Sequence, residues 1–337
     1  MKKIFWRGLA LSAAMFAASV CPVFAQNYGP TEAAMQEGMA AYYAGDWDAC
    51  IAKFESVLNE TPQDTLALAY ILDASFRKNN VDGVINKYEL AYMASGEAPA
   101  EHAQLGLAYF LRGLINRNAL DDSLTEFQGT VRDDPNCSLA YTGIGMVYFQ
   151  KRMMPQSKGY FVRGLRLNPH DVMAMDRLGN IILVDEKKPA EALEIYERIV
   201  QELPTYPDGH YFMGSALYDL GRYEEALPYL RRCAELDPKG YTQGYDAITL
   251  GGEVYMKLDR MEEAKAAFEH ALTLYPESNY CKYKLQTIAD PSLRAKPVPK
   301  DDRRASVLTT QIQNNAAAAE DANATPADKA TEPAPAE

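Results

Sequence analysis

One column of bulky residues recurs along this chain at a nearly constant interval. Its members are, in order, Phe54, Tyr88, Phe127, Phe161, Tyr196, Leu230 and Phe268. Successive spacings are 34, 39, 34, 35, 34 and 38 residues, which is one 34-residue unit interrupted by short insertions. A unit of this length cannot bury its apolar faces alone, so it must stack against neighbours like itself. The period therefore predicts a repeat array.

The best preserved copy, at 207–240, predicts two amphipathic helices. Its apolar and small residues recur at spacings of three and four, which places them on one helical face. They are Met213, Gly214 and Leu217 before Gly221, and Tyr223, Ala226, Leu230 and Cys233 after it. Gly221 then joins the two helices, and Pro238 ends the second by removing an amide donor.

This pattern is similar to that of the tetratricopeptide repeat. The small residue, elbow glycine, aromatic residue, alanine, bulky residue and terminal proline of that repeat stand here as Gly214, Gly221, Tyr223, Ala226, Leu230 and Pro238. The tetratricopeptide period is also 34 residues. The resemblance implies an all-α solenoid, a right-handed superhelix of helix-turn-helix units.

The repeats and their flanking segments can be placed by this pattern. We expect a polar lead at 26–30 and repeats at 31–64, 65–98, 104–137, 138–171, 172–206, 207–240 and 245–278, followed by a capping helix at 279–290. The second and third copies are the most altered, and Asn79 takes the elbow of the second because asparagine tolerates a left-handed backbone. The fifth copy has one residue inserted near its elbow, at 187–189. The Ala- and Pro-rich composition of 291–337 predicts a disordered, acidic tail.

The first 25 residues have the parts of a secretory signal segment. A positive start at Lys2, Lys3 and Arg7 precedes an apolar run at 8–20, and a small-residue cleavage site ends at Ala25. The apolar run is shorter than the roughly 20 residues that a spanning helix needs. We therefore expect a bacterial exported protein, periplasmic or associated with the outer envelope.

Two further features limit the classes of partner. Membrane association requires a lipid on Cys21, and the preceding Ala18-Ser19-Val20 resembles a bacterial lipobox poorly. The formal charge of −12 becomes −15 when the three cationic residues of the signal segment are removed. A chain this acidic repels phosphate backbones, so we expect no nucleic-acid partner.

No residue pattern predicts catalysis, a cofactor or a metal ion. The four histidines, His102, His170, His210 and His270, lie in different units and at no metal-ligand spacing. The cysteines of the mature part are Cys50, Cys137, Cys233 and Cys281, and two of them occupy repeat positions where alanine is usual. We expect small buried apolar residues there. The glycines at 143 and 145 fall inside a first helix and predict close helix packing rather than a phosphate loop.

The resemblance also implies that particular first-helix positions line a concave groove. Carried over residue by residue, the candidate protein-binding residues are Met35, Met39, Tyr42, Phe76, Met146, Phe149, Tyr211, Ser215, Tyr218, Asp246, Glu253 and Met256. Methionine and tyrosine offer adaptable apolar contact area, and inward acidic residues such as Asp208 favour a partner segment that is apolar with some positive charge. The alternative is that these first-helix positions only support packing between units.

We expect a protein-binding scaffold or adaptor in an envelope machine, such as a pilus, secretion or outer-membrane complex. A holding chaperone for exported chains is one alternative, because the same groove would serve it. A cell-wall-acting enzyme is another alternative, although no nucleophile, metal site or acid and base pair is evident.

Overall fold

The structure is a computed structural model, and it describes residues 31–117 and 119–295. The predicted signal segment, the polar lead, Cys21 and the tail beyond residue 295 lie outside the described residues. Residue 118, the predicted elbow of the third repeat, is also outside them.

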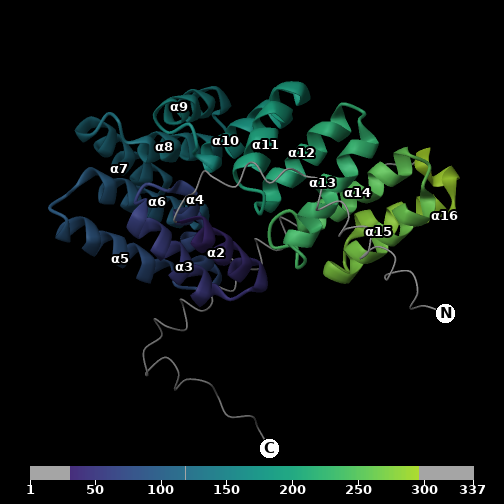
Figure 1. Ribbon diagram of the computed structural model, residues 1–337, viewed down its shortest axis with the longest axis horizontal. Coiled ribbons are helices and arrows are strands. Elements are labelled where there is room, and N and C mark those ends of the chain that lie inside the picture. Colours follow the sequence, from purple (N-terminus) through teal and green to yellow (C-terminus); the bar gives the residue numbers. More distant parts are fainter. Residues whose placement is uncertain (1–30, 118, 296–337) are drawn as a thin grey trace, which may run out of the picture.

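The described residues are helical and contain no strand, so the predicted all-α fold is confirmed. The helices are α2 (Glu32–Ala44), α3 (Trp47–Glu60), α4 (Thr65–Arg77), α5 (Val81–Ala94), α6 (Pro99–Ile115), α7 (Ala119–Asp133), α8 (Ser138–Gln150), α9 (Met154–Leu167), α10 (Val172–Asn180), α11 (Pro189–Glu202), α12 (Pro207–Asp219), α13 (Tyr223–Leu236), α14 (Gly244–Lys257), α15 (Met261–Leu274) and α16 (Asn279–Ala289). Short helices follow α10 and α16, namely the π-helix η2 (Ile181–Asp185) and the 3₁₀ helix η3 (Pro291–Ala295). Figure 1 shows the helices stacked in chain order along an arc.

Consecutive helices pair because a left-handed residue reverses the chain between them. Such a residue stands at Gly45 (φ 82°), Asn79 (55°), Arg152 (61°), Lys187 (56°), Gly221 (73°) and Asp259 (59°). The left-handed conformation costs asparagine less free energy than it costs most residues, which explains how the second copy keeps its elbow without glycine.

The bulky column forms the centre of the stack. Its seven members are at most 5% exposed, and five of them are fully buried. In each well-preserved repeat the ring or branched side chain packs on a glycine of the preceding helix. A Cβ at Gly38 would lie 2.9 Å from Phe54, and one at Gly214 would lie 2.6 Å from Leu230. The small and bulky positions of the repeat are therefore the two halves of one contact.

The extra residue of the fifth copy lies elsewhere than predicted. We expect it near the elbow, at 187–189, but the structure absorbs it in the last turn of the first helix, as η2. The amide of Glu186 donates to the carbonyl of Ile181 at 3.0 Å, and the amide of Lys188 donates to the carbonyl of Ile182 at 3.0 Å. A single widened turn accommodates one inserted residue without breaking the helix.

The insertion before the third repeat is helical, and the start of the tail differs from the prediction. Residues 99–103 form the first turns of α6, because Pro99 is well tolerated at the first helical position. Residues 291–295, which we expected to be disordered, form η3, and the hydroxyl of Tyr283 donates to the carbonyl of Leu293 at 3.1 Å. Helix α16 packs on the last repeat, with Tyr280 6.4 Å from Phe268 between ring centroids.

The array also closes on itself. The chain between α13 and α14 reaches helices α2 and α4, and Figure 1 shows this green segment beside the purple first helices. Lys239 Nζ donates to the carbonyl of Ala44 at 2.6 Å, and the hydroxyls of Tyr43 and Thr242 lie 3.4 Å apart. We call this contact the seam; its residues are Tyr42, Tyr43, Trp47 and Arg77 on one side and Lys239, Tyr241 and Thr242 on the other.

A second contact joins distant repeats. Asp171 caps α10, accepting from the amide of Ala174 at 3.0 Å. It also accepts from the hydroxyl of Thr65 on α4 at 2.5 Å and from that of Thr142 on α8 at 2.7 Å. Asp171 is 3% exposed, so these hydrogen bonds replace the water that its carboxylate has lost. Repeats two, four and five are thereby held together at one point.

Candidate functional site

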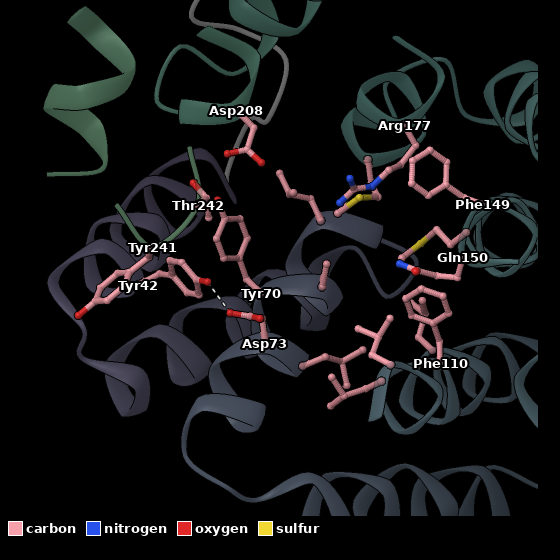
Figure 2. Close-up of a pocket in the computed structure, with 18 of the residues that line it drawn as sticks. Tyr42, Tyr70, Asp73, Phe110, Phe149, Gln150, Arg177, Asp208, Tyr241 and Thr242 are labelled. Carbon is pink, nitrogen blue, oxygen red and sulfur yellow. Dashed lines mark hydrogen bonds between the residues drawn. The ribbon is translucent and has the colours of Figure 1, made fainter. Parts of the chain in front are cut away.

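Closure of the array leaves a cavity on its inner side. The cavity has a volume of about 350 Å³, within the range of small-ligand and peptide pockets. Its walls come chiefly from the first helices α2, α4, α6, α8 and α10. They include Tyr42, Leu66, Ala69, Tyr70, Leu72, Asp73, Arg77, Leu107, Phe110, Leu111, Leu114, Met146, Phe149, Gln150, Met173, Arg177, Tyr206, Asp208, Tyr241 and Thr242. Figure 2 shows many of these side chains around one central space.

One wall is apolar and partly open. Phe110 and Met146 are buried, at 6% and 9% exposure, and Phe149 is half-buried. Leu114, at the end of α6, is 43% exposed although it is aliphatic. Apolar surface that stays open to solvent inside a cavity marks a place where a partner's side chains can bind.

The opposite wall is the seam, organised around Arg77. Its guanidinium lies 5.3, 5.4 and 5.2 Å from the ring centroids of Tyr42, Trp47 and Tyr241. Arg77 Nε donates to Asp73 at 2.6 Å, and the Tyr42 hydroxyl donates to the same carboxylate. Burial, followed by the charge of Asp73, raises the pKa of Tyr42 well above its usual value. Tyr42 therefore stays a neutral donor.

The third wall brings one carboxylate, Asp208, and one guanidinium, Arg177, to the cavity, and Asp176 is buried beside Arg177. Asp208, in the first turn of α12, turns its carboxylate towards the cavity (Figure 2), and its Oδ1 has no hydrogen-bond partner. Asp176 is 0% exposed and neither of its carboxylate oxygens accepts a hydrogen bond. The neighbouring cation is Arg177, whose Nη1 lies 3.7 Å from Asp176. Two carboxylates thus face one guanidinium.

Burial, followed by the nearby Asp176 carboxylate, raises the pKa of Asp208 from its usual 3.8 to about 7. The folded state therefore holds this proton more tightly than the unfolded state does. The resulting stability is present below pH 3.8 and is lost as pH rises towards 7.

Asp208→Asn removes the charged form, so we expect it to raise the free energy of unfolding at pH 8 by about 1 to 2 kcal/mol. At acid pH, where Asp208 is neutral, the variant should match the wild type. Urea unfolding at both pH values measures this difference. An equal effect of the substitution at both values would contradict it.

The structure brings three of the predicted groove residues into the cavity, namely Tyr42, Met146 and Phe149. Met35 and Met39 are 0% and 1% exposed, so the closed array buries them where a ligand cannot reach. Phe76 is 7% exposed and does not line the cavity. Met35, Met39 and Phe76 are all part of the hydrophobic core, so packing removes them from the surface that a ligand could contact.

The remaining predicted residues lie on α12 and α14, outside the cavity. All of them are half-buried: Tyr211, Ser215, Tyr218, Asp246, Glu253 and Met256. The Tyr218 hydroxyl donates to Glu253 at 3.1 Å, and Lys284 of α16 lies 3.0 Å from the same carboxylate. This chain of contacts links three consecutive units, so Tyr218 and Glu253 have a packing role in addition to any role in binding.

Several cavity residues were not among the predicted site residues. They include Arg77, Phe110 and Arg177. These residues stand one or more positions away from the first-helix positions that the resemblance assigns to the groove, so the repeat pattern alone does not single them out. Tyr241 had a signal, because it belongs to the insertion 241–244 that interrupts the repeat period. An insertion that the stacking does not need is free to make a contact elsewhere.

The four cysteines and two of the four histidines are buried, whereas His170 and His270 are exposed. His102 Nε2 lies 2.6 Å from Glu126, and His210 Nε2 lies 2.8 Å from the carbonyl of Pro204. The cysteines at 50, 137, 233 and 281 are all buried, and burial raises the pKa of Cys50 to about 12 and that of Cys137 to about 11. Groups of three or more potential metal ligands are absent from residues 31–117 and 119–295. Across the same residues, every helix is too short or too polar to span a bilayer.

Comparisons with known proteins agree with the repeat pattern. Family models of the tetratricopeptide repeat match residues 183–243 and 246–278. Superkiller protein 3 of Schizosaccharomyces pombe is 24% identical over 226 residues, which is 63% of this chain and 16% of that protein. Superkiller complex protein 3 of Mus musculus is 24% identical over 259 residues, which is 75% of this chain and 16% of that protein. This chain thus spans 16% of the length of each.

A solved structure is also similar in fold. PilW, a widely conserved type IV pilus biogenesis factor, has a TM-score of 0.50 to this chain at 17% identity, covering 64% of this chain and 93% of that one. At this identity the likeness concerns the fold alone. Taken with the period, the elbows and the buried column, these matches show that the chain contains tetratricopeptide repeats and folds as an all-helical tetratricopeptide-like solenoid.

Proposed function

We propose that this protein is a scaffold or adaptor that binds a peptide segment of a partner protein in the cavity between its repeats. Tetratricopeptide proteins bind protein or peptide partners, and the fold is generally non-catalytic. The observation that carries the proposal is the cavity itself, whose apolar wall keeps Leu114 43% exposed beside Phe110 and Phe149.

The proposed partner segment is apolar with some positive charge. Aliphatic or aromatic side chains would bury the wall formed by Phe110, Leu114 and Phe149, because removing apolar surface from water stabilises a complex. Asp208 supplies negative charge at the other side of the same space. The proposed location is the bacterial envelope; this rests on the signal segment at 1–25, and fractionation of the producing cells tests it.

Leu114→Glu tests the binding role, because a carboxylate at this position must be desolvated when apolar side chains cover the wall. Peptides selected from a random dodecapeptide library on the wild-type protein serve as the probes. We expect Leu114→Glu to weaken the selected peptides at least about tenfold, a difference of about 1.4 kcal/mol. Fluorescence anisotropy with labelled peptides measures the change.

Leu167→Glu is the matched control, because Leu167 is 39% exposed on α9 and lies outside the cavity. It should leave peptide affinity within about twofold, and both variants should keep wild-type helicity since both positions are already exposed. Equal effects of the two variants, or a library that yields no bound peptide, would overturn the proposal. Weak binding of peptides without any shared sequence feature would point to a holding chaperone instead.

A further inference from the structure

The cationic side chains that line the cavity already interact with other residues. Among the described lining residues these cations are Arg77 and Arg177. Arg77 bonds Asp73 at 2.6 Å and is enclosed by the three aromatic rings of the seam. Arg177 lies 3.7 Å from Asp176 and 5.9 Å from the Phe149 ring. Arg177 also attracts Asp208, so the two carboxylates Asp176 and Asp208 share its single positive charge.

Asp208 is also placed where water cannot compensate for the missing cation. Its Oδ1 is inaccessible to solvent and accepts no hydrogen bond, although it borders a cavity with room for a ligand. The Thr242 side chain hydrogen-bonds the Asp208 carboxylate, but Oδ1 is left without a partner. A buried carboxylate oxygen without a partner is costly, which favours binding of a proton or a cation. Asp176, with both oxygens unbonded and 0% exposure, adds to the negative potential at this point.

Resting on the proposed function, we propose that Asp208 receives the ammonium or guanidinium group of a lysine or arginine in the bound segment. The stem of such a side chain is apolar, so it can lie along apolar side chains while its charged head reaches a carboxylate. The cavity supplies both surfaces, because Figure 2 shows Phe110 on one side and Asp208 on another, and Leu114 also lines the cavity. A cation at Asp208 would balance the excess carboxylate.

The groups around Asp208 define how pH acts on this site. The ionisable residues that interact with it are Asp176 and Arg177 of α10, Tyr196 of α11, Tyr206 before α12, Cys233 of α13, Asp237 directly after α13, Tyr43 of α2 and Tyr70 of α4. Asp237 already accepts from the amides of Tyr241, Thr242 and Gly244 at 2.8 to 2.9 Å. Protonation of Asp208 therefore removes the negative charge that this residue presents to the ligand.

Three six-carbon probes separate charge from apolar contact: n-hexylammonium, 1-hexanol and hexanoate. Titrations of the full chain at pH 8, followed by NMR, should show hexylammonium binding at least about tenfold tighter than hexanol, with hexanoate weakest. Asp208→Asn should bring hexylammonium within about twofold of hexanol. On the wild type, hexylammonium affinity should fall as pH drops from 8 to 5, whereas hexanol affinity should not change.

Asp219→Asn is the control, because Asp219 lies on the same helix but is exposed and outside the cavity. It should leave all three probes unchanged, and thermal melting checks that both variants fold. Equal binding of hexylammonium and hexanol, or unchanged hexylammonium binding in Asp208→Asn, would overturn the cation site. If selected peptides still bind in a Leu114-dependent way in that case, the peptide-binding function stands and this inference alone fails. If neither peptides nor probes bind, both fail.

Discussion

Gly143→Ala is expected to lower the free energy of unfolding by about 2 kcal/mol. A Cβ at this position in α8 would lie 2.2 Å from Cζ of Phe127 and 2.3 Å from its Cε1. Phe127 is 0% exposed, so its ring has no free space into which it can move. The better helix propensity of alanine stabilises the folded state by only about 1 kcal/mol, so the free energy lost to the steric clash is larger.

Gly159→Ala is the matched control for this prediction. Gly159 lies in the adjacent helix α9, is exposed, and has no atom within 4 Å of the added Cβ. Only the helix propensity acts there, so we expect stabilisation by up to about 1 kcal/mol. Urea unfolding followed by circular dichroism measures both. The packing explanation would be wrong if the two substitutions shifted stability in the same direction.

Arg77→Ala is expected to open the seam and to cost about 2 kcal/mol or more, because desolvated cation–π contacts are each worth up to about 2 kcal/mol. The substitution removes one guanidinium from three rings at once, and it also removes a hydrogen bond from Arg77 Nη2 to the carbonyl of Tyr241 at 3.4 Å. Asp73 would lose its cation while remaining close to the Tyr42 hydroxyl. The two sides of the seam would then be joined by Lys239, by the pair of hydroxyls and by the contacts of the Tyr241 ring with Trp47 and Tyr42.

Trp47 provides a local probe of this opening. It is the sole tryptophan of residues 26–337, and its ring centroid lies 5.3 Å from that of Tyr241. In a chain that begins at residue 26, Arg77→Ala should shift tryptophan emission to longer wavelength and increase the radius of gyration measured by X-ray scattering. Arg112→Ala is the control, since Arg112 covers the single ring of Tyr109 at 5.6 Å and lies away from the seam. Unchanged emission and radius in Arg77→Ala would rule out Arg77 as the residue that holds the seam.

The cavity depends on closure of the seam, because residues from both sides of the seam line it. Tyr42, Asp73 and Arg77 come from one side, whereas Asp208 and Tyr241 come from the other. The cavity therefore has its charged walls only while the array is closed. A partner segment would meet a shaped site rather than an extended groove, which reduces the conformational entropy lost on binding by the protein.

Much of the fold could be predicted because repeat packing is local. Gly214 and Leu230 are sixteen residues apart, and their contact is implied by one small and one bulky position in the same unit. Asn79 was expected at a left-handed elbow, and its φ of 55° agrees. The inserted residue of the fifth copy could not be placed in the same way, since an elbow and a widened helical turn both accommodate one residue.

The candidate site was predicted less completely, because repeat positions describe which face a residue occupies and not what covers that face. Tyr42, Met146 and Phe149 were expected to line a groove and do border the cavity. Met35 and Met39 occupy equivalent inward positions but are buried. Arg177 acquires its place from the repeats that surround it, and no periodic signal distinguishes it from other charged residues on first helices.

The sequence alone determined the helical class, the 34-residue unit and the packing of each helix on its neighbours. These features depend on contacts within one or two units, and the residues that make those contacts recur in each unit. Tertiary structure alone decided that the array closes, since Thr65 bonds Asp171 across 106 residues and Tyr43 meets Thr242 across 199 residues. Such contacts depend on the accumulated curvature of several units, and small differences in each repeat add up to a geometry that no single repeat encodes.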